Sequence, residues 1–171
     1  MPEPKPQTDA DRSVIRDIAT RGWHIVVVAE RNDRPGWAFT IGLQRSFEHP
    51  EVIAFGLPGT ANREIADRIA RDIAAGNTHP AGSTCDKILQ GLPCEFRAVD
   101  RSWYETFLGY AVWYYGDGNF PVIQFLWPDR ENRLPDRPDF DPDLAGLQPL
   151  LEHATAEEAR VTDLLHALDK V

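Results

Sequence analysis

Residues 37–43 and 51–57 place the strongest constraint on the fold, because each is a short run rich in aromatic and β-branched residues. Runs of this composition, bounded by turn residues, predict β-strands. The polar loop between them, residues 44–50, is short enough for the two strands to pair as antiparallel neighbours. Glycine weakens a strand interior, so Gly42 and Gly56 each predict a bulge or a close approach by another backbone or a ligand. We therefore expect a sheet that contains these two strands.

Other elements follow from the hydrophobic pattern on either side. The apolar run 23–29 predicts a strand covered on both faces. Further strands are predicted at 87–89, 92–99 and 120–127, and helices at 8–20, 61–75, 103–115 and 156–170. Because the strands cluster early instead of alternating with helices, the predicted class is α+β. We expect a curled, mainly antiparallel sheet or a small, partly open barrel, with three to four helices packed outside.

The length of 171 residues suits one domain with a core of its own. We predict a disordered tail at residues 1–7 and a single α+β domain at residues 8–127. Residues 128–171 are predicted to form an arm rich in proline and aspartate, followed by a helix that packs on the same domain.

The charge balance excludes some partners. The chain has 27 acidic and 18 basic residues and a formal net charge of −9, which disfavours phosphate backbones and anionic membrane surfaces. No apolar run is long enough to cross a bilayer, and the start of the chain does not have the pattern of a signal peptide, so a cytoplasmic location is predicted. Cys85 and Cys94 lack metal-ligand spacing and are predicted to be free thiols, with a disulfide or redox pair as the alternative.

Three short motifs carry a resemblance to a known family. They are TIGL at residues 40–43, HPE at 49–51 and GL at 56–57. Together they resemble the signature of the bacterial domain-of-unknown-function family four-two-six-two, over residues 22–100 and on to 127–129. The resemblance implies a small bacterial intracellular domain. It transfers no catalytic residue, since the family has no assigned activity.

His49 and Glu51 are the candidate catalytic residues. Imidazole is the usual general base near neutral pH, and a neighbouring carboxylate can fix its tautomer. The alternative is structural, with His49 hydrogen-bonded to backbone in its loop. The histidines and cysteines show no ligand spacing, so no metal site is predicted.

A ligand pocket is the leading functional hypothesis. Thr40 and Gly42 can present a hydroxyl and an amide to a phosphate or a flavin, and the aromatic helix at 103–115 can line a pocket with Trp127 and Phe39. The alternatives are that Thr40 is only a good strand former and that the aromatic helix packs in the core. The candidate ligand-binding residues are Thr40, Gly42, His49, Tyr114, Gln124, Trp127 and Asp129.

Three function classes remain open from the sequence. The first is a domain that binds a small molecule or peptide in a pocket lined by residues 44–50 and 103–115. The second is a flavin-binding barrel oxidoreductase, although the common dinucleotide motifs are absent. The third is an acidic module that interacts with or inhibits another protein. Whether the chain is an enzyme is left undecided.

Overall fold

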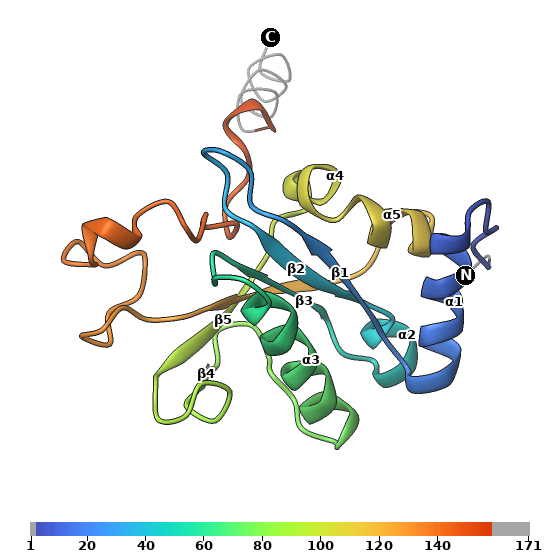
Figure 1. Cartoon of the computed structure of the whole chain (residues 1–171), viewed down its shortest axis with the longest axis horizontal. Helices are drawn as coiled ribbons and strands as arrows, with labels where there is room; N and C mark the ends of the chain where they lie inside the picture. Colours follow the sequence, from blue (N-terminus) through green and yellow to red (C-terminus); the bar gives the residue numbers. More distant parts are fainter. Residues whose placement is uncertain (1–2, 159–171) are drawn as a thin grey trace, which may run out of the picture.

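The computed structural model describes residues 3–158, so most of the helix predicted at 156–170 lies outside the described residues. It contains one six-stranded sheet in the order β1-β2-β3-β6-β5-β4 (Figure 1). The strands are β1 His24–Val28, β2 Trp37–Ile41, β3 Glu51–Phe55, β4 Thr84–Cys85, β5 Cys94–Ala98 and β6 Val122–Leu126. The central pair β3 and β6 is parallel, and the other neighbouring pairs are antiparallel. The predicted α+β class with a mainly antiparallel sheet is confirmed, and the sheet stays open instead of closing into a barrel.

Helices cover both faces of the sheet. They are α1 Asp9–Arg21, α2 Leu43–Phe47, α3 Ala61–Ala74, α4 Tyr104–Phe107 and α5 Gly109–Tyr115, with 3-10 helices η1 Arg101–Trp103 and η2 Pro142–Leu144. Side chains of β3 alternate between two apolar cores, since Val52 and Ala54 pack with α3, whereas Ile53 and Phe55 pack with α1, α4 and α5. The short helices α2 and α5 are therefore attached to a sheet that is covered by helices on both faces.

The sequence features that predicted the two long helices, α1 and α3, are present in the structure. At α1, Thr8 and Asp11 make a capping box, and Gly22 ends the helix in the left-handed conformation with φ 98°. In α3, Ile65, Ile69 and Ile73 are all buried, as their spacing along one face predicts.

Three local predictions were wrong. The segment predicted as a polar loop at 44–50 contains the short helix α2. The short strand predicted at 87–89 lies earlier, at β4, and Ile88 is instead a buried core residue in a turn. The single helix predicted at 103–115 is interrupted at Leu108, where φ is −127° and ψ is 24°.

Gly42 and Gly56 both lie against the backbone of other segments. A side-chain carbon at position 42 would lie 2.7 Å from the carbonyl oxygen of Gly22, and one at position 56 would lie 2.5 Å from that of Leu147. The close approach predicted at Gly42 and Gly56 is therefore an approach of backbone, and it joins α1 and the arm to the sheet.

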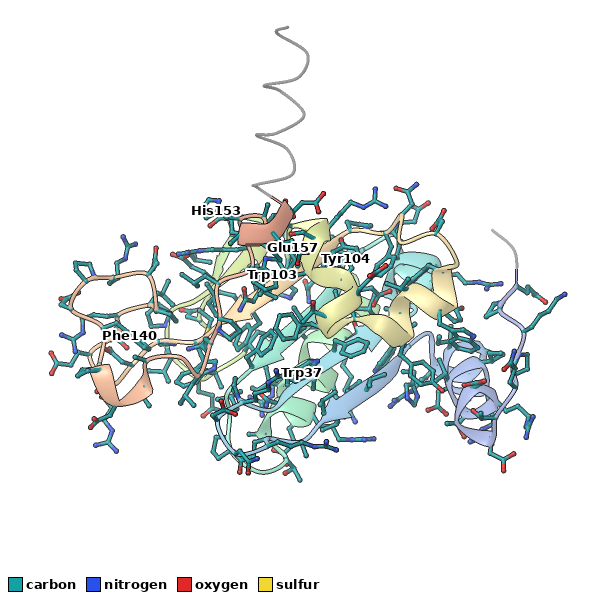
Figure 2. The ribbon with its side chains drawn as sticks, turned by 90° about the horizontal axis from the view of Figure 1, so that it is seen from above. Trp37, Trp103, Tyr104, Phe140, His153 and Glu157 are labelled. Carbon is teal, nitrogen blue, oxygen red and sulfur yellow. The ribbon has the colours of Figure 1, made fainter. Side chains whose placement is uncertain are left out.

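Residues 128–149 form the irregular arm, which extends far from the sheet before it returns. Figure 2 shows Phe140 in its outer part and His153 above Trp103, where the chain has come back to η1. The indole Nε1 of Trp103 donates to the carbonyl oxygen of His153 at 2.7 Å. Among the described residues, no helix combines the length and apolarity needed to span a membrane.

Candidate functional site

A buried carboxylate lies at the start of β3. Glu51 is 0% exposed, and its Oε2 accepts a hydrogen bond from Thr40 Oγ1 at 2.6 Å. Its Oε1 accepts from the backbone amides of Gly42 at 2.9 Å and Gln44 at 3.2 Å, and from the hydroxyl of Tyr115. One side chain thus connects β2, the start of α2 and the end of α5.

The electrostatics of this cluster follow from its burial. Burial raises the pKa of the Glu51 carboxyl, while hydrogen bonds from Thr40, Tyr115, Gln44 and Gly42 act in the opposite direction. Burial also raises the pKa of Tyr115, and the adjacent Glu51 raises it further. Because the carboxylate is fully enclosed and receives four donors, its geometry favours a packing role over proton transfer to a substrate. The catalytic assignment of Glu51 stays an untested prediction.

His49 lies apart from this cluster and contacts backbone through both ring nitrogens. Its Nε2 accepts from the amide nitrogen of His79 at 3.0 Å, so the ring proton is on Nδ1, which donates to the carbonyl oxygen of Pro50 at 2.8 Å. Burial lowers the pKa of His49, the neighbouring His79 adds to this, and the bond to Pro50 opposes it. The ring is therefore a neutral bridge between the 44–50 loop and residue 79.

Two further predicted ligand residues make hydrogen bonds to backbone, Gln124 to the returning chain and Trp127 to β3. The side-chain amide of Gln124 donates to the carbonyl oxygen of Pro149 at 2.6 Å and accepts from the amide nitrogen of Leu151 at 3.1 Å. The indole of Trp127 donates to the carbonyl oxygen of Phe55 at 2.8 Å. The side-chain amide of Gln124, which was predicted as a polar contact for a ligand, is thus occupied by backbone.

Asp129 holds the base of the arm. Its carboxylate accepts from the backbone amides of Glu131, Arg133 and Asp141 at 2.9 to 3.0 Å and from Nε of Arg133 at 2.8 Å. Burial alone would raise the pKa of Asp129, but these hydrogen bonds lower it to about 2. The residue thus remains ionised as an organiser of the loop.

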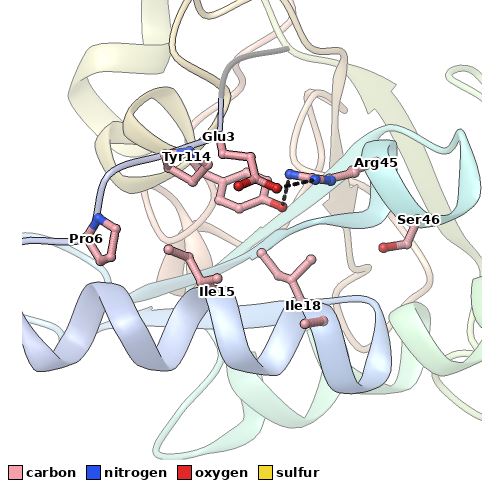
Figure 3. A pocket seen from close by; sticks show the side chains of 9 residues that line it. Glu3, Pro6, Ile15, Ile18, Arg45, Ser46 and Tyr114 are labelled. Atoms are coloured by element: carbon pink, nitrogen blue, oxygen red, sulfur yellow. Dashed lines mark hydrogen bonds and ion pairs between the residues drawn. The ribbon is translucent and has the colours of Figure 1, made fainter.

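Tyr114 is the predicted ligand residue that borders an open cavity. The cavity has a volume of about 500 Å³ and lies between α1, α2, α5 and the N-terminal segment (Figure 3). Its lining residues are Glu3, Pro4, Pro6, Ile15, Ile18, Ala19, Arg45, Ser46 and Tyr114. The cavity thus brings α2, within the predicted 44–50 segment, next to part of the aromatic segment, and it has a wall from α1 that was not predicted.

Arg45 is the polar centre of this cavity, although it was not among the predicted site residues. Its Nη1 donates to the hydroxyl of Tyr114 at 3.2 Å, and its Nη2 lies 3.8 Å from Oε1 of Glu3. The guanidinium carbon lies 6.0 Å from the centroid of the Tyr114 ring, within cation–π range. The available signal was a single arginine in the polar loop between the two principal strands.

The described residues show neither a metal-binding cluster nor the barrel on which the flavin hypothesis was based. Within residues 3–158, no group of three or more His, Cys, Asp or Glu side chains is arranged to hold a metal ion. The flavin hypothesis was based on a small barrel with hydroxyls and amides on adjacent strands, whereas the sheet is open. In addition, the Thr40 hydroxyl already donates to Glu51 and accepts from the amide nitrogen of Val52.

Comparison with known proteins gives one match. No curated protein and no solved structure matches the chain. The model of one family, described as Domain of unknown function (DUF4262), matches residues 17–141. That span contains all six strands, the Glu51 cluster, Arg45 and Tyr114. The chain therefore belongs to the DUF4262 family, as the motifs around Thr40, His49 and Gly56 indicated.

Proposed function

We propose that this domain binds a small molecule or a peptide end that carries a carboxylate next to an apolar group. The ligand would lie in the cavity between α1, α2 and α5. The observation that carries the proposal is the position of Arg45, whose guanidinium borders a cavity of about 500 Å³ beside an apolar wall.

The shape and lining of the cavity suit such a ligand. Ile15, Ile18 and Ala19 of α1 form an apolar wall, while Arg45 and the Tyr114 hydroxyl supply polar groups close together. Small-molecule sites are commonly concavities of about 300–1,000 Å³, mainly apolar, with a few polar groups that fix orientation. The apolar part of the ligand would contact α1 and its carboxylate would contact Arg45.

Arg45 has donor capacity left for a carboxylate. Its contact with Glu3 is longer than a charge-assisted hydrogen bond of about 2.7–2.9 Å. The Glu3 side chain is 85% exposed, so the pair is weak. A planar guanidinium can accept a carboxylate through two parallel hydrogen bonds, and a ligand carboxylate would displace Glu3 at little cost.

The test is a titration of the labelled protein by NMR with two matched probes, hexanoate and its neutral analogue hexanamide. We expect hexanoate to shift the amide signals of Arg45, Ser46 and Tyr114. Hexanamide should bind about tenfold more weakly, a difference of about 1.4 kcal/mol. Both probes offer the same apolar chain, so the difference isolates the carboxylate.

Two variants separate a specific contact from general attraction. Arg45→Gln should remove the preference for hexanoate. Arg16→Gln removes the same charge from an exposed position on α1 outside the cavity lining, and it should leave the preference unchanged. Equal binding of both probes to the parent protein, or an equal loss in both variants, would refute the proposal.

A further inference from the structure

The two cysteines of the chain face each other across two paired strands. Cys85 in β4 and Cys94 in β5 are direct partners in the antiparallel register. Directly opposed residues have Cα atoms about 4.5–5.5 Å apart, which lies inside the range of about 4.4–6.8 Å found for disulfides. Opposed side chains also point to the same face of the sheet, so the two sulfur atoms lie on one side.

The two thiols differ in their access to solvent. Cys94 is 0% exposed within the core next to α3, and its thiol donates weakly to the carbonyl oxygen of Leu92 at 3.6 Å. Cys85 is partly exposed and borders a separate polar cavity of about 460 Å³. Asn77, Ser83, Thr84 and Lys87 also border this cavity. A reagent in the cavity would therefore reach Cys85 first.

We propose that Cys85 and Cys94 form a thiol–disulfide exchange site that low-molecular-weight disulfides oxidise through the polar cavity. The Cys85 thiolate attacks one sulfur of the reagent, which breaks the reagent's S–S bond, forms a mixed disulfide and releases one thiolate. The Cys94 thiolate then attacks Sγ of Cys85 and releases the second thiolate. The two cysteines lose two electrons in total, and their two protons end on the two reagent thiols.

The environment of Cys94 sets the order and the pace of these steps. Burial, and then the nearness of Cys85, raise the pKa of the Cys94 thiol to about 12. The thiolate is the nucleophile in exchange, so the second step should be slow near neutral pH and should accelerate as the pH rises. The mixed disulfide on Cys85 is therefore expected to accumulate before the internal disulfide forms.

The disulfide would link the edge strand β4 covalently to β5. The strand β4 has two residues and pairs with β5 alone. A Cys85–Cys94 bond would close the turn that contains Lys87 and Ile88. Oxidation should thus slow cleavage by trypsin after Lys87 in the folded protein.

The experiment exposes the reduced, folded chain at low concentration to glutathione disulfide and follows its intact mass. The expected sequence is first the mass of one glutathione adduct, and then the loss of two hydrogen masses relative to the reduced chain. Trypsin cleaves after Arg71, Lys87 and Arg97, which places the two cysteines on peptides 72–87 and 88–97. After denaturation and digestion, the oxidised product should yield these two peptides joined.

Single variants distinguish the two roles. Cys94→Ala should stop at the glutathione adduct on Cys85. Cys85→Ser should remain unmodified while folded, because its remaining thiol is buried. Circular dichroism checks the fold of both. A parent protein that retains the glutathione adduct through a rise to alkaline pH, or whose thiols react only when unfolded, would overturn the proposal without any variant.

Discussion

The amide nitrogen of His79 donates to Nε2 of His49 across 3.0 Å, and both residues are buried. This bond predicts that His49→Ala is mainly a stability variant. Removing the imidazole leaves a buried amide without its acceptor, which costs about 1–3 kcal/mol in the free energy of unfolding. Urea unfolding measures the loss. His153→Ala is the control, since His153 is exposed and should change stability by less than about 0.5 kcal/mol. Equal losses would contradict a structural bridge.

Gly56→Ala is expected to weaken the packing of the arm, at Leu147, against the sheet. Position 56 has φ 77°, and a side-chain carbon there would lie 2.5 Å from the carbonyl oxygen of Leu147. Gly76→Ala is the matched control, because Gly76 has φ 99° with open space around it. The control carries backbone strain of about 1–2 kcal/mol, and Gly56→Ala should cost clearly more. Hydrogen exchange at Leu151, whose amide bonds Gln124, should increase only in Gly56→Ala.

Asp129 should contribute to acid unfolding. Its folded pKa of about 2 lies below its ordinary value of 3.8, so the unfolded chain binds the proton more readily. The stabilisation is therefore complete above the ordinary pKa and is lost as the pH falls from about 3.8 to about 2. In Asp129→Asn this part of the pH dependence should disappear. Unfolding measured between pH 6 and pH 2 tests it, and parallel curves for both proteins would show the assignment to be mistaken.

Glu51 should have the opposite pH dependence. Burial raises its folded pKa above the ordinary 4.5, so the folded protein retains the proton more strongly than the unfolded chain. Its contribution falls as the pH rises from 4.5 through the raised pKa. Glu51→Gln is neutral at every pH, and its amide oxygen can still accept from the backbone amides of Gly42 and Gln44. The stability gap between parent and variant should therefore change in favour of the variant as the pH rises. A gap independent of pH would show that Glu51 does not titrate in this way.

Local patterns were sufficient to predict most of the sheet and the long helices. The runs at 37–43 and 51–57 became β2 and β3, and the spacing of Ile65, Ile69 and Ile73 identified the buried face of α3. These features depend on neighbours along the chain. The strand β1 contacts both cores through Ile25 and Val26, as its apolar run predicted, whereas the exposure of Val27 depends on tertiary packing near the end of the strand.

The site was predicted only in fragments, because its members meet through tertiary contacts. Thr40, Gly42 and Glu51 proved to be neighbours, but their partner Tyr115 lies far along the chain and was not singled out. Gln124 and Asp129 looked like free polar groups because the backbone that they bind, at residues 131–151, has no periodic pattern.

The position of Glu51 has a consequence for the proposed ligand cavity. Two of its hydrogen-bond donors, Gln44 and Tyr115, are the chain neighbours of Arg45 and Tyr114. The backbone positions of Arg45 and Tyr114 are therefore linked by one buried side chain behind them. A ligand would meet polar groups whose backbone is already ordered, which lowers the cost of binding. We therefore expect the affinity for different acids to depend mainly on the length and shape of their apolar part.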